Sequence, residues 1–197
     1  MLNPHAGASV LDAGCGTGYF TRALARTGLE TTGLDPDANA IRFARSRAGL
    51  RERYVIGDAQ ALPFPNACFD YTVAITSFCF IADQARALSE LARVTRRRVA
   101  LGLLNRRSLL YRQKVGRGAY RGAHWHTAGE VRQLFEQSGM PDVTPRFAIY
   151  LPRGGWLAER VEAVMPGALP LGGFLLAVAD VRGAISSGTT MQYRRVG

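Results

Sequence analysis

Three glycines that follow an aspartate near the start of the chain have the types and spacing of a nucleotide-type site. Residues 10–20 read Val-Leu-Asp-Ala-Gly-Cys-Gly-Thr-Gly-Tyr-Phe, so an apolar run ends at Asp12 and passes into Gly14, Gly16 and Gly18. Glycine lacks a Cβ, so the backbone there can take positive φ and a ligand can approach it closely. The helix expected next has unpaired N–H groups in its first turn. These residues therefore predict a strand, a glycine turn and a helix that together bind a ligand.

The glycine spacing favours an amino-acid-like cofactor over a dinucleotide. The dinucleotide fingerprint is G-x-G-x-x-G, whereas this loop reads G-x-G-x-G and has Tyr19 where the last glycine would stand. A carboxylate at Asp12 would repel a pyrophosphate and could help to hold an ammonium group. The loop therefore argues against NAD, and a tight turn without a ligand is the alternative for this block alone.

At these residues the chain resembles the class I S-adenosylmethionine (SAM)-dependent methyltransferases. Their first motif is hydrophobic-hydrophobic-Asp/Glu-x-Gly-x-Gly-x-Gly, and the resemblance runs from about Val10 to Val181. It is closest to the small-molecule enzymes of the ubiquinone/menaquinone-biosynthesis type, methyltransferase type 11. It implies SAM as the cofactor and S-adenosylhomocysteine (SAH) as the product. It also implies a Rossmann-like, doubly wound α/β sheet of seven strands in the order 3-2-1-4-5-7-6, with the last strand antiparallel and helices on both faces.

Two further acids stand at expected strand ends. Asp35 comes 21 residues after Gly14, where a carboxylate can accept hydrogen bonds from two ribose hydroxyls, although it could also cap a helix that starts at Pro36. Asp58 follows the expected third strand and could equally form an Asx turn. The resemblance implies that Pro36 lies against the adenine, that Asp58 accepts from its amino group, and that the Ala59 amide reaches a ring nitrogen.

The fourth strand is expected to end where the cofactor meets the methyl acceptor. Thr76 stands at the carboxyl end of this strand, beside the point at which the strand order reverses. Phe78 and Phe80 follow and either shape an apolar pocket or belong to the core. The residues expected to bind the cofactor are Asp12, Gly14, Cys15, Gly16, Gly18, Asp35, Pro36, Asp58, Ala59 and Thr76.

His124 and His126, which flank Trp125, are the candidate catalytic general bases. They lie in the long connection after the fifth strand, which begins at the ligand edge of the sheet. A base adds roughly two to four orders of magnitude in rate, and alignment of acceptor, methyl and sulfur alone supplies roughly 7 to 11 kcal/mol. Packing or capping is the alternative role, because a helix N-terminus disfavours a protonated imidazole. No metal site is expected, since His-x-His alone is an incomplete ligand set.

The formal net charge is +10, and it is distributed unevenly. No acidic residue lies between Glu90 and Glu130. The basic loop 106–121 holds Tyr111 and Tyr120 among its cations, which are Arg106, Arg107, Arg112, Lys114, Arg117 and Arg121. It could bind an anionic small substrate, follow RNA phosphates, lie on an anionic membrane surface that presents a lipid, or be a solvated loop.

Strands and helices alternate along the chain, which is typical of a parallel sheet covered on both faces. The pattern predicts strands over 9–13, 30–35, 53–57, 69–76, 97–104, Val143–Leu151 and Gly173–Val181. It predicts helices over 19–27, 37–47, 84–94, 127–138 and Trp156–Met165, the last with an apolar face that either packs on the core or walls the substrate pocket.

A single domain is expected over residues 1–197, with no secretory signal and no membrane-length apolar run. Cys15, Cys68 and Cys79 lack metal or disulfide spacing, so reduced thiols and a cytoplasmic location are expected. Only about eight residues precede the first strand, whereas the resembled family carries a helical lid there. The leading interpretation is a methyltransferase for a small-molecule or lipid-like acceptor. RNA methylation through the basic loop and a SAM-binding regulatory protein are the alternatives, and the oligomeric state stays open.

Overall fold

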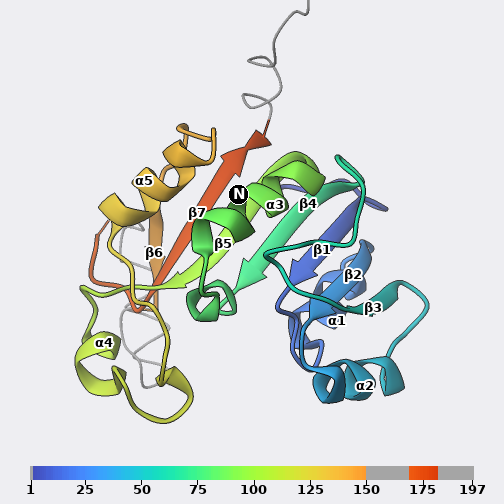
Figure 1. Cartoon of the computed structure of the whole chain (residues 1–197), viewed down its shortest axis with the longest axis horizontal. Coiled ribbons are helices and arrows are strands. Elements are labelled where there is room, and N and C mark those ends of the chain that lie inside the picture. The colour runs from blue at the N-terminus through green and yellow to red at the C-terminus, as the bar shows by residue number, and fades with distance from the viewer. Residues whose placement is uncertain (1, 150–168, 182–197) are drawn as a thin grey trace, which may run out of the picture.

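The protein is built on one seven-stranded sheet. The structure is a computed structural model that describes residues 2–149 and 169–181. The strand order is β3-β2-β1-β4-β5-β7-β6 (Figure 1). Neighbouring strands from β3 to β5 pair in parallel, and β7 is antiparallel to both β5 and β6. The predicted order and the antiparallel last strand are therefore confirmed. The strands are β1 (Ser9–Ala13), β2 (Glu30–Asp35), β3 (Glu52–Ile56), β4 (Phe69–Ile75), β5 (Thr95–Leu104), β6 (Arg146–Ala148) and β7 (Phe174–Asp180).

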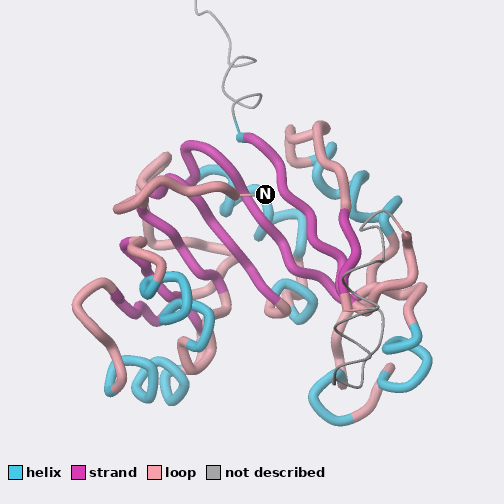
Figure 2. The backbone as a smooth tube through the Cα atoms, turned by 180° about the vertical axis from the view of Figure 1, so that it is seen from behind, coloured by secondary structure: helices cyan, strands magenta, loops and turns pink. Residues whose placement is uncertain are grey.

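Helices lie on both faces of the sheet, which Figure 2 shows from behind with its strands side by side. Val10 packs with Leu24 of α1, whereas its neighbour Leu11 joins a larger cluster with Leu88 of α3 and Phe135 of α5. Successive side chains of a strand point to opposite faces, so α1 covers one face and α3 and α5 cover the other. The helices are α1 (Tyr19–Arg26), α2 (Ala38–Ser46), α3 (Gln84–Val94), α4 (Leu109–Lys114) and α5 (Ala128–Gln137), with short 3-10 turns η1 (Phe78–Phe80) and η2 (Gly118–Tyr120).

Polar side chains fix where two of the helices begin. Asp37 caps α2, because its carboxylate accepts hydrogen bonds from two backbone amides of the first turn. The capping role that the sequence left open for Asp35 therefore belongs to Asp37. Thr127 and Glu130 form a capping box at the start of α5, which is the helix predicted over 127–138.

The structure differs from the sequence-based expectation mainly in the last third of the chain. Of the expected strand Val143–Leu151, residues 150–151 lie outside the described part of the chain, and within the rest the edge strand β6 covers Arg146–Ala148. Pro145 has no N–H for a ladder and stands just before the strand. The helix α4 and both 3-10 turns were not predicted, and the helix expected over Trp156–Met165 lies outside the described residues. Within the described part of the chain, no helix has the length and apolarity needed to cross a membrane.

A buried amide joins the end of β5 to the start of β7. Asn105 is 1% exposed, and its Nδ2 donates to the carbonyls of Pro170 at 3.0 Å and Gly172 at 2.7 Å. Its Oδ1 accepts from the Arg107 amide at 3.0 Å. This side chain therefore ties the chain just before α4 to the loop that leads into β7.

We predict that Asn105→Ala lowers the free energy of unfolding by at least about 2 kcal/mol, because it leaves buried backbone groups without partners. Urea denaturation measures this. Asn39→Ala, the same change at an exposed position of α2, should stay within about 0.5 kcal/mol. Equal losses for the two variants would contradict the role given to Asn105.

Candidate functional site

The glycine turn between β1 and α1 lies at the carboxyl edge of the sheet. Gly14, Gly16 and Gly18 have φ of 73°, 52° and 78°, which L side chains rarely adopt. A Cβ on Gly14 would collide with the Ser77 side chain, and one on Gly18 would lie 2.6 Å from the Tyr54 hydroxyl. A Cβ on Gly16 would meet nothing within 4 Å. Packing therefore requires Gly14 and Gly18, and open space remains beside Gly16.

The end of β2 holds this turn in place. The amides of residues 14–15 donate to the Leu34 carbonyl at 2.7 and 3.0 Å, and the Gly16 amide donates to Asp35 Oδ2 at 2.8 Å. Asp35 Oδ1 accepts from the Asp37 amide at 2.9 Å. A carboxylate offers about four lone-pair positions, so Asp35 can still accept two further hydrogen bonds, as the two hydroxyls of a ribose require.

A cavity of about 240 Å³ opens beside the turn. It is lined by Gly14, Leu34, Asp35, Pro36, Asp58, Ala59, Ser77, Phe80 and Ile81, which come from the ends of β1, β2, β3 and β4. Two carboxylates and a set of apolar walls thus face one space, and no Lys or Arg is among the lining residues. This chemistry fits an adenosine carrying a cationic substituent better than it fits a pyrophosphate.

The loop after β3 contributes Asp58 and Ala59 to this cavity. Asp58 Oδ1 accepts from the Gln60 amide at 2.8 Å, which is the Asx turn that the sequence allowed. Asp58 Oδ2 receives the Gln60 side-chain amide at 3.1 Å. The turn holds the carboxylate beside the apolar wall and leaves it lone pairs for a further donor.

Ser77 stands where Thr76 was expected. Thr76 adopts an unusual φ of 62° and its hydroxyl donates to the Ile75 carbonyl at 2.6 Å, outside the lining of the cavity. Ser77 lines the cavity, and its Oγ donates to the Ala13 carbonyl at 2.7 Å. The turn at Thr76 swings Ser77 against the glycine loop, and no sequence signal indicated it. Phe80 lines the cavity and is 50% exposed, whereas Phe78 is fully buried core.

Asp12 and Cys15 lie behind the turn and do not line the cavity. Asp12 is 2% exposed and accepts from the Thr21 hydroxyl of α1 at 2.7 Å. Burial raises the pKa of Asp12 to about 6, and burial together with the charges of Asp12 and Asp35 raises the pKa of the Cys15 thiol to about 12. Cys15 packs against the core between α2 and β3 as a neutral thiol. A direct contact of Asp12 with the ligand stays a prediction.

The two candidate bases lie elsewhere. His124 is exposed and His126 is 7% exposed, and both line a separate cavity of about 340 Å³ beside α3 and α5. His126 Nε2 lies 2.9 Å from Gln84 Oε1, and burial lowers its pKa to about 4, so it is neutral near physiological pH. The two cavities share no lining residue. The structure therefore does not bring either histidine to the cavity beside the glycine turn, and no cluster suited to a metal ion occurs in residues 2–149 and 169–181.

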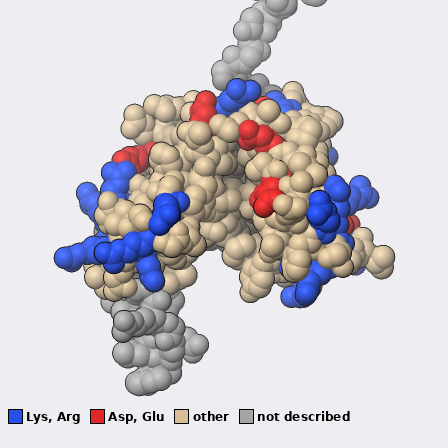
Figure 3. Space-filling view, turned by 60° about the horizontal axis from the view of Figure 1, so that its bottom comes forward, with Lys and Arg blue, Asp and Glu red and all other residues tan. Residues whose placement is uncertain are grey.

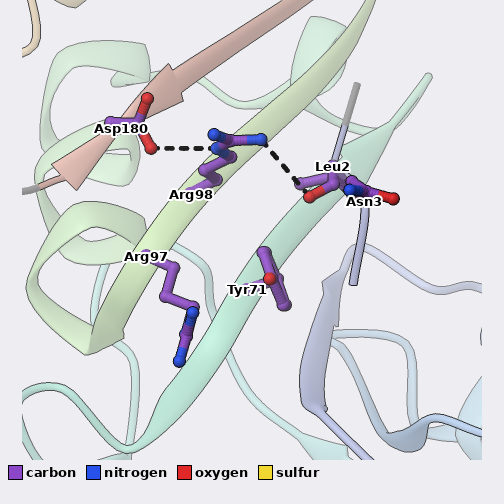
Figure 4. A pocket seen from close by; sticks show the side chains of 6 residues that line it. All are labelled: Leu2, Asn3, Tyr71, Arg97, Arg98 and Asp180. Atoms are coloured by element: carbon purple, nitrogen blue, oxygen red, sulfur yellow. Dashed lines mark hydrogen bonds and ion pairs between the residues drawn. The ribbon is translucent and has the colours of Figure 1, made fainter. Parts of the chain in front are cut away.

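A further cavity, of about 480 Å³, lies at the opposite edge of the sheet (Figure 4). Arg98 crosses it, with Nε donating to Asp180 Oδ1 at 2.9 Å and Nη1 to the Leu2 carbonyl at 3.5 Å. None of the predicted cofactor-binding residues lines it. Since ligands of doubly wound sheets bind at the carboxyl ends of the strands, the cavity beside the glycine turn is the candidate site.

Comparison with known proteins agrees with this geometry. Residues 11–101, which include the glycine turn and the ends of the first four strands, match the family model described as a methyltransferase domain. Residues 11–101 therefore belong to a methyltransferase domain, and the sheet has the strand order of the class I SAM-dependent methyltransferases. SAM is the cofactor of this family.

Two named relatives are similar to the methyltransferase domain. The malonyl-(acyl-carrier protein) O-methyltransferase of Pectobacterium atrosepticum is 38% identical over 96 residues, which is 49% of this chain and 38% of that protein. The demethylmenaquinone methyltransferase of Tropheryma whipplei is 39% identical over 101 residues, which is 45% of this chain and 40% of that protein. The chain therefore spans less than half the length of either relative.

Solved structures share the fold. A SAM-dependent methyltransferase of Thermotoga maritima, described as a possible histamine N-methyltransferase, superimposes with a TM-score of 0.72 at 21% identity, covering 90% of this chain and 84% of the other. The magnesium protoporphyrin IX methyltransferase of Synechocystis PCC 6803, solved with bound SAH, gives a TM-score of 0.65 at 18% identity over 89% of this chain and 74% of the other. These likenesses confirm the Rossmann-like methyltransferase fold.

The buried carboxyl of Asp12 predicts a pH dependence of stability. Its pKa in the folded state, about 6, lies above the ordinary value of 3.8, so folding favours the protonated form. The stability it contributes is fully present below pH 3.8 and is lost as the pH rises through about 6. Asp12→Asn removes the titration, so its stability relative to the natural protein should rise by roughly 3 kcal/mol across this window. Urea denaturation at several pH values measures the difference, and a constant difference would contradict the raised pKa.

Proposed function

We propose that the methyltransferase domain binds SAM in the 240 Å³ cavity and transfers its methyl group to a small-molecule or lipid-like acceptor. The supporting observation is that Asp35 and Asp58 face one apolar-walled space next to the glycine turn. In this proposal Asp35 accepts from the ribose hydroxyls and Asp58 accepts from the adenine amino group. Pro36 and the Ala59 amide complete the adenine pocket.

The charge distribution around the cavity supports a cationic cofactor. Lys and Arg gather on both sides of a hollow at the carboxyl edge and are absent from its centre (Figure 3). Asp12 lies buried behind the turn, and its charged form would be favoured by a nearby cation. The carboxylates would attract an ammonium or sulfonium and repel a phosphate.

In this proposal Phe80 and Ile81, which line the cavity, form the side that faces the methyl acceptor. SAM supplies an already electrophilic methyl, so the protein's main task is to align it with the acceptor. An apolar, half-exposed Phe80 suits an acceptor with an apolar part. The relatives named for malonyl-(acyl-carrier protein) and demethylmenaquinone support a small or carrier-bound acceptor here.

We predict saturable binding of SAM and SAH by isothermal titration calorimetry and no binding of NADH. Saturable NADH binding, or no heat with either adenosyl compound from folded protein, would overturn the proposed cofactor. Transfer of labelled methyl from SAM into small-molecule or lipid fractions of a cell extract then separates a methyltransferase from a SAM-binding regulatory protein. Transfer into RNA alone would favour RNA methylation.

Asp35→Ala should weaken SAH binding roughly 10- to 100-fold, because charge-assisted hydrogen bonds to the ribose are lost. Calorimetry on folded variants measures this. The matched control is Asp37→Ala, which removes the cap of α2 but no group that lines the cavity. It should cost about 1 kcal/mol of stability and leave the affinity unchanged. Equal affinities for the two variants would contradict the ribose role of Asp35.

A further inference from the structure

The segment between β5 and α5 presents cations without acidic partners. Arg106 is the exception, because it pairs with Glu130 at 2.8 Å and donates to the Trp125 carbonyl at 2.8 Å. The other cations of the segment are exposed and form no side-chain hydrogen bond or ion pair with the described residues; they are Arg107, Arg112, Lys114, Arg117 and Arg121. Their charges are therefore available to a partner.

Apolar side chains are exposed beside these cations. Leu109 and Val115 of the α4 region are 48% and 43% exposed, and Ile149 and Leu171 are 45% and 52% exposed. The chain segments that carry them pack together, since the Gly173 amide donates to the Ile149 carbonyl at 2.8 Å and a Cβ on Gly173 would lie 3.2 Å from the Leu110 side chain. Exposed apolar groups that gather in this way mark an interaction surface. We call these cations and apolar side chains together the α4 surface.

We propose that the α4 surface docks the protein on an anionic lipid bilayer. Lys and Arg near a membrane are attracted to anionic headgroups, and exposed aliphatic side chains enter the boundary with the acyl chains. The proposal rests on the proposed function, because it places the methyl acceptor in or beside the membrane. The occupant it names is a bilayer that contains anionic phospholipid.

The α4 surface lies at the same edge of the sheet as the cofactor cavity. In Figure 1, α4 is below the sheet, at the edge toward which β1 and β4 point. The His124 amide, which follows the basic loop, donates to the Cys79 carbonyl of η1 at 2.7 Å. Phe80, which follows Cys79 in η1, lines the cofactor cavity. A bilayer on the α4 surface would therefore present its lipids near the acceptor side of the cavity.

The aromatic residues of the loop favour a membrane over RNA. Tyr111 and Tyr120 are partly buried and pack on buried Trp125. Their ring centroids lie 5.2 and 5.6 Å, respectively, from that of Trp125. Single-stranded RNA is held by stacking its bases on exposed aromatic rings. These rings pack against the core, and among the described residues the large exposed apolar side chains beside the cations are aliphatic.

Vesicle flotation of the whole chain tests the proposal, with no SAM present. The vesicles contain phosphatidylcholine alone or phosphatidylcholine with phosphatidylglycerol. We expect binding only to the anionic vesicles, and a loss on the order of 100-fold for the triple variant Arg112→Gln, Lys114→Gln and Arg117→Gln. The matched control carries the same charge change on the other side of the molecule, Arg26→Gln, Arg42→Gln and Arg53→Gln, and should keep most of the binding. Leu109→Ser should weaken binding without changing the charge.

Equal binding to both vesicle types, equal losses in the two triple variants, or binding to a single-stranded RNA without vesicle binding would overturn the proposal. SAH calorimetry on the same samples separates the two proposals. If the protein binds SAH but no vesicle, the membrane proposal is overturned and the proposed cofactor stands. If it binds anionic vesicles but not SAH, the proposed cofactor is overturned and the membrane surface stands.

Discussion

The hydrogen bond from the Gly16 amide to the Asp35 carboxylate, 2.8 Å long, is the interaction on which the site depends. It joins the turn after β1 to the end of β2, and the Leu34 carbonyl reinforces it by accepting from the first two amides of the turn. The parallel register that pairs Ala13 with Leu34 brings these two strand ends level. One carboxylate thereby shapes the positive-φ loop and remains oriented to accept hydrogen bonds from a ligand.

The molecule separates its charges into two local environments. The cavity beside the glycine turn is lined by two aspartates and no cation, whereas the exposed cations of the basic loop stand outside it. Screening limits interactions between exposed charges to about 8 to 10 Å at moderate salt, so the net charge of +10 need not weaken the attraction of the cavity for a cation. Under the two proposals made above, this separation would let one edge of the sheet bind a cationic cofactor and face an anionic partner.

The sequence predicts those features that local geometry imposes. Positive φ favours glycine in the turn, and the acids stand at strand ends, so several of the residues that line the cavity could be inferred. The strand order is the one that the resemblance to the class I methyltransferases implies. Contacts between distant segments could not. His126 is paired with Gln84, 42 residues away, and Ser77 enters the cavity only because Thr76 takes an unusual backbone conformation. The aromatic residues of the basic loop likewise pack on Trp125 through tertiary contacts that spacing does not reveal.

An amide NMR titration of isotopically labelled protein with SAH is the most direct measurement of where the cofactor lies. We predict that the largest changes in amide chemical shift occur at Gly14 to Gly18, at Asp35 and at Asp58 and Ala59. The amide resonances of α4 and of the opposite sheet edge around Arg98 should not shift. Saturable binding that shifts the amides around Arg98 or His126, and leaves the glycine turn unchanged, would contradict a cofactor site beside that turn.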